Sequence, residues 1–236
     1  MRYFAIHLLP VIAVAASILA MDHAGIDPLV SGWFFDPHIN GFPLRYNGFV
    51  EVALHHGAKY VVALVAVAAY AAYLISFLSE SLRPQRTPCL FIALALTLAP
   101  LAVAAMKFFS MRHCPWDVAG FGGYVPYAGL LEAYPFNAAP GRCFPAGHAS
   151  TGFCLFAFYF AGLAFKNTAW ARVGFALGLS AGLALGLVRI MQGAHFATHV
   201  LWSGVVCWIV ITVLYGLMLQ PRDQRGGVAG QQTSPE

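Results

Sequence analysis

Long apolar segments separated by shorter polar stretches dominate the pattern of this chain. A helix needs about 20 mainly apolar residues to cross a bilayer. Six segments come within a few residues of this length: 4–21, 59–79, 88–108, 149–166, 171–190 and 199–219. The pattern predicts an all-α protein, a six-transmembrane-helix bundle that forms a single membrane domain over residues 1–219. The remaining stretch, 220–236, is polar and glycine-rich, which is typical of a disordered tail.

The first apolar segment allows two interpretations. Arg2 precedes the apolar run, and the sequence Ala16-Ser17-Ile18-Leu19-Ala20 resembles a signal-peptide cleavage region. An uncut first helix instead makes the number of helices even and puts both termini on the same side of the membrane. We favour the uncut helix.

Composition also indicates a lipid environment. The chain is 60% hydrophobic and only 9% charged, whereas about a quarter of the residues in a soluble domain are charged. So few charges cannot cover a water-exposed surface of this size. The net charge of +4 is spread out, without the basic run that nucleic-acid binding requires. Glycine-rich phosphate loops and dinucleotide-binding motifs are absent from the sequence.

The basic residues predict the orientation of the bundle. With a cytoplasmic N-terminus, seven Lys and Arg residues fall on the inner side and six on the outer side. Four of the outer six belong to the polar cluster described next. Without these four, seven basic residues lie on the inner side and two on the outer side. The positive-inside rule then places both termini in the cytoplasm. The long connections 22–58 and 109–148 and the turn 191–198 become extracytoplasmic, and the size of the chain suggests a bacterial inner membrane with a periplasmic site.

Polar residues gather at the predicted outer ends of the helices, in the stretches 107–117, 142–148 and 189–199. Because the six-helix topology puts all three at one membrane depth, we expect them to lie close together. Lys and Arg side chains bind phosphate oxygens, and a helix N-terminus, as expected after Pro145, also favours an anion. One histidine can attack phosphorus while another protonates the leaving oxygen. The cluster therefore predicts chemistry on a phosphate group.

These residues resemble the signature of the type 2 phosphatidic acid phosphatases, which reads Lys-x6-Arg-Pro, Pro-Ser-Gly-His and Ser-Arg-x5-His-x3-Asp. The corresponding stretches here are Lys107-x6-Cys114-Pro115, Pro145-Ala146-Gly147-His148 and Val188-Arg189-x5-His195-x3-His199. The resemblance implies that His195 is the nucleophile, forming a phosphohistidine, and that His148 is the general acid. It also implies that no metal and no other cofactor is needed. It further implies that Lys107 and Arg189 bind the phosphate, supported by the Gly147 backbone N–H. The expected phosphate-binding set also includes Ala146, Arg112 and Arg142.

The signature is altered at several positions. Cys114 stands where arginine is expected, and we expect Arg112, or alternatively Arg142, to replace that arginine. His199 stands where the aspartate that orients the nucleophile is expected. One helical turn separates it from His195, so that it is able to accept a hydrogen bond but supplies no negative charge. Asp117 in the neighbouring loop is the candidate source of that charge. Ala146 and Val188 replace two serines, with the loss of one potential hydrogen bond each.

Two further possibilities concern cysteines and metals. Cys114 and Cys143 share one connection and can form a disulfide if it faces an oxidising compartment. The spacing His195-x3-His199 also allows both imidazoles to bind zinc, with His113, His148, Asp117 or Cys114 completing the site. The surrounding cations argue against a zinc site, because they would repel a dication.

The sequence therefore predicts a membrane phosphatase acting on a lipid phosphomonoester or pyrophosphate. Candidate substrates are phosphatidic acid, phosphatidylglycerophosphate, polyprenyl pyrophosphate and phosphorylated lipid A. The alternatives are a lipid phosphotransferase that uses the same site, and a non-catalytic protein that binds anionic lipids or transports a solute. The expected partners are the lipid substrate and membrane lipids, with no nucleic acid, and the sequence carries no signal for the oligomeric state.

Overall fold

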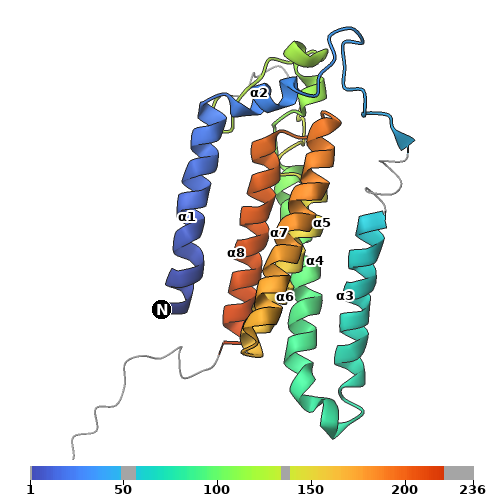
Figure 1. Cartoon of the computed structure of the whole chain (residues 1–236), viewed down its shortest axis with the longest axis vertical. Helices are drawn as coiled ribbons and strands as arrows, with labels where there is room; N and C mark the ends of the chain where they lie inside the picture. The colour runs from blue at the N-terminus through green and yellow to red at the C-terminus, as the bar shows by residue number, and fades with distance from the viewer. Residues whose placement is uncertain (1, 49–56, 134–138, 221–236) are drawn as a thin grey trace, which may run out of the picture.

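The computed structural model describes residues 2–48, 57–133 and 139–220, and long helices dominate it (Figure 1). The long helices are α1 (Arg2–His23), α3 (Gly57–Ile75), α4 (Arg86–Phe108), α7 (Thr168–Met191) and α8 (Ala197–Met218). The shorter elements are α2 (Ile26–Gly32), α5 (Gly147–Phe153), α6 (Ala157–Ala164), η2 (Glu80–Gln85), η3 (Pro115–Asp117), η4 (Ala119–Phe121) and η5 (Cys154–Phe156). The described residues form isolated β-bridges but no strand. The predicted all-α fold is confirmed.

Five helices of the described chain are long and apolar enough to cross a membrane. They are Ala5–His23, Gly57–Ile75, Glu80–Phe108, Thr168–Met191 and Ala197–Met218. The predicted helix 149–166 differs, because the helical run there is divided into α5, the 3-10 turn η5 and α6. A hydropathy average over the whole segment does not register the division, since the apolar residues of η5 and α6 outweigh the polar residues of α5. The predicted disordered tail lies outside the described residues from position 221 onward.

Helix α7 packs closely against α5 and α6 along a face of small residues. The backbone of Gly152 in α5 lies so near Gly182 that a side chain at position 152 would overlap α7, and Gly162 meets Ala171 in the same way. Such close approach replaces the hydrophobic driving force that lipid cannot provide between helices. Four buried glycines recur at every fourth position of this α7 face: Gly174, Gly178, Gly182 and Gly186.

The buried core lies among α4, α5, α6 and α8, where Phe91, Phe160 and Ile211 have no exposed surface. Helices α1 and α3 pack on opposite sides of this core, α1 against α8 and α3 against α4 (Figure 1). Only 11% of the residues in each of their apolar windows are buried. Outward-facing side chains such as Leu9 and Leu64 are apolar, as a lipid-facing surface requires.

The two ends of the bundle differ in structure. Helix α1 begins and α8 ends at one end, whereas α2 and the longer connections gather at the other (Figure 1). A small second cluster of buried side chains lies in these connections: Phe42, Val118, Phe121, Val125 and Phe196. This cluster holds together three loops that are far apart in the sequence, next to the start of α8.

Candidate active site

Three separated stretches of sequence converge on His195 in the turn between α7 and α8. Lys107 lies in the last turn of α4, His148 in the first turn of α5, and Arg189 in the last turn of α7. Lys107, His148 and Arg189, together with His199, all interact electrostatically with His195. The structure therefore brings together Lys107, His148, Arg189 and His195 at one end of the bundle.

His195 is buried, with 1% of its surface exposed. Burial lowers the pKa of the His195 imidazole well below its usual value, and electrostatic interactions with Lys107, His199 and Arg189 lower it further. The ring is therefore neutral at pH 7. A neutral imidazole keeps a nitrogen lone pair, which a nucleophile or a general base requires.

The turn that carries His195 has a defined helix-ending geometry. Gly193 adopts φ 69°, a conformation that glycine reaches without steric cost. The Gly193 N–H donates to Ile190 O at 2.9 Å, and the Ala194 N–H donates to Arg189 O at 2.9 Å. This is the Schellman pattern that ends many helices. It fixes the path of the chain from Arg189 to His195.

Arg189 is held by residues that the sequence analysis did not single out. Its Nη1 donates to Oε1 of Gln192 at 2.7 Å, and Nε2 of Gln192 donates to Leu44 O at 3.3 Å. Gln192 is 1% exposed, so this contact is shielded from water. The loop before α3 thereby supports the arginine at the end of α7.

Additional cations surround Arg189. The guanidinium carbons of Arg45 and Arg189 lie 4.5 and 6.0 Å from the centre of the same Trp116 ring, distances typical of cation–π contacts. Lys59, at the start of α3, interacts electrostatically with Arg189 and Lys107. The sequence offered one signal for Arg45 and Lys59: they are the two predicted outer cations that the motifs do not explain.

Arg112 and Arg142 make other contacts. The Arg112 guanidinium donates to the carbonyl oxygens of Ala128 at 3.4 Å, Leu130 at 2.9 Å and Glu132 at 2.7 Å. These bonds occupy the guanidinium with the 128–132 loop, so the structure gives Arg112 a loop-holding contact where a phosphate contact was expected. Arg142 is exposed and lies 4.7 Å above the ring centre of Phe108.

Asp117 does not support His195 in the way we expected. Its Oδ2 lies 3.7 Å from Nδ1 of His113, and Nε2 of His113 lies 3.0 Å from Ala139 O. Asp117 follows Trp116 in η3, which directs it to the neighbouring imidazole on its own loop. The carboxylate therefore contributes to the loop rather than contacting the proposed nucleophile.

His199 is also placed differently from the expectation. Its ring packs edge-on against Phe144 and Phe196, with centroids 5.3 and 5.4 Å away. The centroid of His195 is 6.2 Å away, and no hydrogen bond joins the two imidazoles in the described chain. Nδ1 of His199 has no hydrogen-bond partner among the described residues. The His199 imidazole is thus held by ring contacts with Phe144 and Phe196 and by a hydrogen bond with the Cys143 backbone, not by a bond to His195.

The second motif is anchored to the first turn of α8. The Ala146 N–H donates to His199 O at 3.1 Å, and the Ser203 hydroxyl donates to Ala146 O at 2.9 Å. Helix α5 begins at the next residue, Gly147, where an added Cβ would meet no atom within 4 Å. Gly147 thus lies at a helix start with open space beside it, whereas Ala146 is fully buried.

The start of α8 is capped by a carboxylate from α2. The Thr198 N–H donates to Oδ1 of Asp27 at 2.9 Å, and the Thr198 hydroxyl donates to Oδ2. Burial raises the pKa of Asp27 from 3.8 to about 6, although both bonds to Thr198 lower it. Helix N-termini favour such acceptors. Asp27 therefore helps to fix the first turn of α8, which carries His199 and follows His195.

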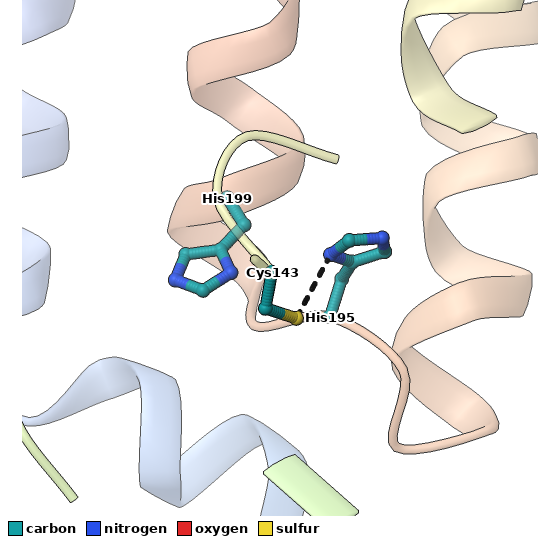
Figure 2. A group of neighbouring side chains, drawn as sticks. All are labelled: Cys143, His195 and His199. Atoms are coloured by element: carbon teal, nitrogen blue, oxygen red, sulfur yellow. Dashed lines mark hydrogen bonds between the residues drawn. The ribbon is translucent and has the colours of Figure 1, made fainter. Parts of the chain in front are cut away.

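Cys114 and Cys143 form a disulfide, with their Cα atoms 5.2 Å apart. Figure 2 shows that Cys143 lies between His195 and His199, and its Sγ is 3.4 Å from Nδ1 of His195. The potential ligand atoms of these three residues lie within 4.8 Å of one another. In the disulfide, Cys143 offers no thiolate, which is the form that binds metal ions. The group then retains two imidazoles beside several cations, a poor fit to zinc.

Comparison with known proteins agrees with this arrangement. The chain matches the family model described as the PAP2 superfamily over residues 88–223, which is more than half of the chain. It is 28% identical over 230 residues to a lipid A 4'-phosphatase of Francisella tularensis subsp. novicida, an alignment that covers 94% of this chain and 100% of that relative. No solved structure matches the chain. Since the matched region holds all three motifs, the chain belongs to the PAP2 superfamily, and it is a phosphoric ester hydrolase with membrane-spanning helices.

Proposed function

We propose that the protein hydrolyses a phosphate monoester of a membrane lipid through a phosphohistidine at His195, and that phosphorylated lipid A is the substrate. One observation supports the mechanism: the side chains of Lys107, His148 and Arg189 interact electrostatically with the buried, neutral imidazole of His195. The substrate is supported by the similarity to the Francisella relative over nearly the whole chain.

The reaction has two steps. The Nε2 lone pair of His195 attacks phosphorus, the bond to the lipid oxygen breaks, and His148 protonates that oxygen. A water molecule then attacks the phosphohistidine while the deprotonated His148 accepts its proton, which releases inorganic phosphate and restores both histidines. Lys107, Arg189 and the Gly147 backbone N–H would stabilise charge on the phosphoryl oxygens in both steps.

We also propose that Arg45 and Lys59 supply positive charge that the first motif lacks at Cys114. Arg45 shares the Trp116 ring with Arg189, and Lys59 interacts with both Arg189 and Lys107. An anionic head group entering between α3, α4 and α7 would therefore meet cations from several elements. Arg142, at the rim, would meet the head group only at its exposed surface.

We propose a membrane placement that is consistent with the same geometry. The run 147–164 would form the sixth crossing together with the five long helices. Both termini would then lie in the cytoplasm, and the His195 end would face the periplasm across the inner membrane. The Cys114–Cys143 disulfide supports this placement, because disulfides persist in oxidising compartments.

Phosphate release from purified protein in detergent tests the function. Phosphorylated lipid A, phosphatidic acid, phosphatidylglycerophosphate and polyprenyl pyrophosphate would be compared as substrates. We expect His195→Ala and His148→Ala to lower kcat by about 10³-fold or more, as for a nucleophile and its acid–base partner. Arg172→Gln is the matched control, because Arg172 is exposed near the opposite end of α7. Release by His195→Ala at the parent rate would contradict the proposal.

A further inference from the structure

A disulfide sulfur lies against Nδ1 of His195, the proposed nucleophile. Nδ1 of His195 lies 3.4 Å from Sγ of Cys143, and both residues are buried (Figure 2). Sulfur in a disulfide carries no hydrogen, so it can only accept a hydrogen bond. The contact is therefore a hydrogen bond only when Nδ1 of His195 carries the ring proton.

The position of that proton decides whether His195 can react. In a neutral imidazole one nitrogen carries the proton and the other keeps the lone pair, and the partner of the first nitrogen sets the choice. With the proton on Nδ1, the lone pair lies on Nε2. Among the described residues, Cys143 is the only side chain that forms a hydrogen bond with the His195 ring.

Two altered motif positions meet at this contact. Cys114 stands at the expected arginine and bonds to Cys143, and His199 stands at the expected orienting aspartate. The His199 ring is held against Phe144 and Phe196 instead of bonding to His195. Position 199 therefore supplies no carboxylate to His195, and the disulfide sulfur is the group that lies against its Nδ1.

We propose that the Cys114–Cys143 disulfide is the positioning group for His195, which holds the Nδ1–H tautomer so that Nε2 attacks phosphorus, and that reduction of the disulfide slows the enzyme. This inference rests on the proposed phosphohistidine mechanism. An added dithiol such as dithiothreitol supplies two electrons and two protons, becomes a cyclic disulfide itself, and leaves two thiols. The Cys143 S–H then donates to the nearby Ala194 O or to Nδ1 of His195. The second bond requires the ring proton on Nε2, which removes the nucleophile.

The expected effect is on turnover rather than on substrate binding. Holding the wrong tautomer of a catalytic histidine costs about 10⁴-fold in kcat in the serine-protease triad. Sulfur is a weaker acceptor than a carboxylate, so we expect kcat to fall by about 10- to 100-fold on reduction. KM should stay within about threefold, because Lys107 and Arg189 remain in place.

The test compares oxidised, reduced and reoxidised full-length protein in detergent, with thiols counted by alkylation. Cys114→Ala/Cys143→Ala should match the reduced protein, and Cys89→Ala, a change at a free cysteine, should keep both the parent kcat and its response to reduction. Nitrogen NMR of ¹⁵N-histidine protein, with His195→Gln for assignment, should show the Nδ1–H tautomer in the oxidised form and a larger fraction of the Nε2–H tautomer after reduction. A merely structural disulfide would not change this signal in folded protein.

The outcomes separate the two proposals. Phosphate release by oxidised parent protein and its loss in His195→Ala report on the proposed function alone. Reduced protein that keeps the parent kcat, or oxidised protein with the proton on Nε2 of His195, overturns the role of the disulfide while leaving the proposed function intact. If the double variant does not fold, reduction and reoxidation of the parent give the same comparison.

Discussion

Arginines near His195 divide into two groups by what their guanidinium groups contact. Arg112 donates to three loop carbonyl oxygens, whereas Arg45 and Arg189 approach the Trp116 ring. Hydrogen bonds from a charged donor each contribute about 1.5–3 kcal/mol. Replacing Arg112 should therefore lower thermal stability, whereas replacing Arg45 or Arg189 should weaken binding of the anionic substrate.

Alanine variants should show this division. We expect Arg112→Ala to lower the Tm, because the 128–132 loop loses its donors, and to change KM little in protein that remains folded. We expect Arg45→Ala to leave the Tm near that of the parent and to lower kcat/KM by about 10-fold, the effect of one lost phosphate contact. Thermal unfolding and phosphate release measured on the same preparations give both values. If Arg112→Ala instead keeps the parent Tm and lowers kcat/KM, Arg112 binds the phosphate.

Asp27 predicts a pH dependence of stability. Burial raises the pKa of its carboxyl from 3.8 to about 6 in the folded protein, so the folded state holds this proton more tightly than the unfolded state. The contribution of the group is therefore fully present below pH 4 and is lost as the pH rises through about 6. The difference corresponds to about 3 kcal/mol.

Asp27→Asn isolates this effect, because asparagine keeps an acceptor for Thr198 but does not ionise. The variant should match the parent near pH 4 and become relatively more stable by pH 7. Thermal unfolding of both proteins across this range gives the difference directly. A constant difference would show that Asp27 does not titrate in this window.

At the scale of elements, sequence patterns predicted the ends of helices better than their interiors. Lys107 and Arg189 interrupt apolar runs, so a hydropathy pattern locates the corresponding ends of α4 and α7. The division of the run 147–164 is different, because it depends on close packing between α5 and α7 at Gly152 and Gly182. A composition average contains no information about such contacts. The sequence did carry one signal for this packing, the glycines that recur at every fourth position of α7.

The turn between α7 and α8 is the element on which the motif spacing depends. Gly193 has φ 69°, and a Cβ at this position would overlap the Phe42 ring. Gly193→Ala should therefore lower the Tm and reduce kcat by about 10-fold or more, because the shifted turn moves His195 relative to Arg189.

Gly120→Ala is the matched control for the turn, since its added Cβ meets no atom within 4 Å. Both variants would be compared with the parent by thermal unfolding and by phosphate release in the same detergent. If Gly193→Ala behaves like Gly120→Ala, the geometry of this turn does not determine activity.

At the scale of the whole molecule, membrane topology explains why the sequence predicts that polar residues far apart in the chain lie close together. Helices that cross one bilayer place their ends at two depths, so polar residues at alternate ends are expected to meet. Lys107, His148, Arg189 and His195 do so. Side-chain partners are not predictable in this way, because the contacts of Asp27, Arg45 and Gln192 join segments far apart in the sequence and depend on the folded tertiary structure.

The same topology predicts which surfaces face the periplasm. Single cysteines would be placed in a Cys89→Ala background at Ala119, exposed in η4 at the His195 end, and at Ser81, exposed in η2 at the opposite end. With both termini cytoplasmic, a membrane-impermeant maleimide should label Ala119→Cys in intact spheroplasts and Ser81→Cys only after the membrane is opened. Labelling of Ser81→Cys alone in intact spheroplasts would reverse the orientation. It would also place the Cys114–Cys143 disulfide in the reducing cytoplasm, where such bonds are rare.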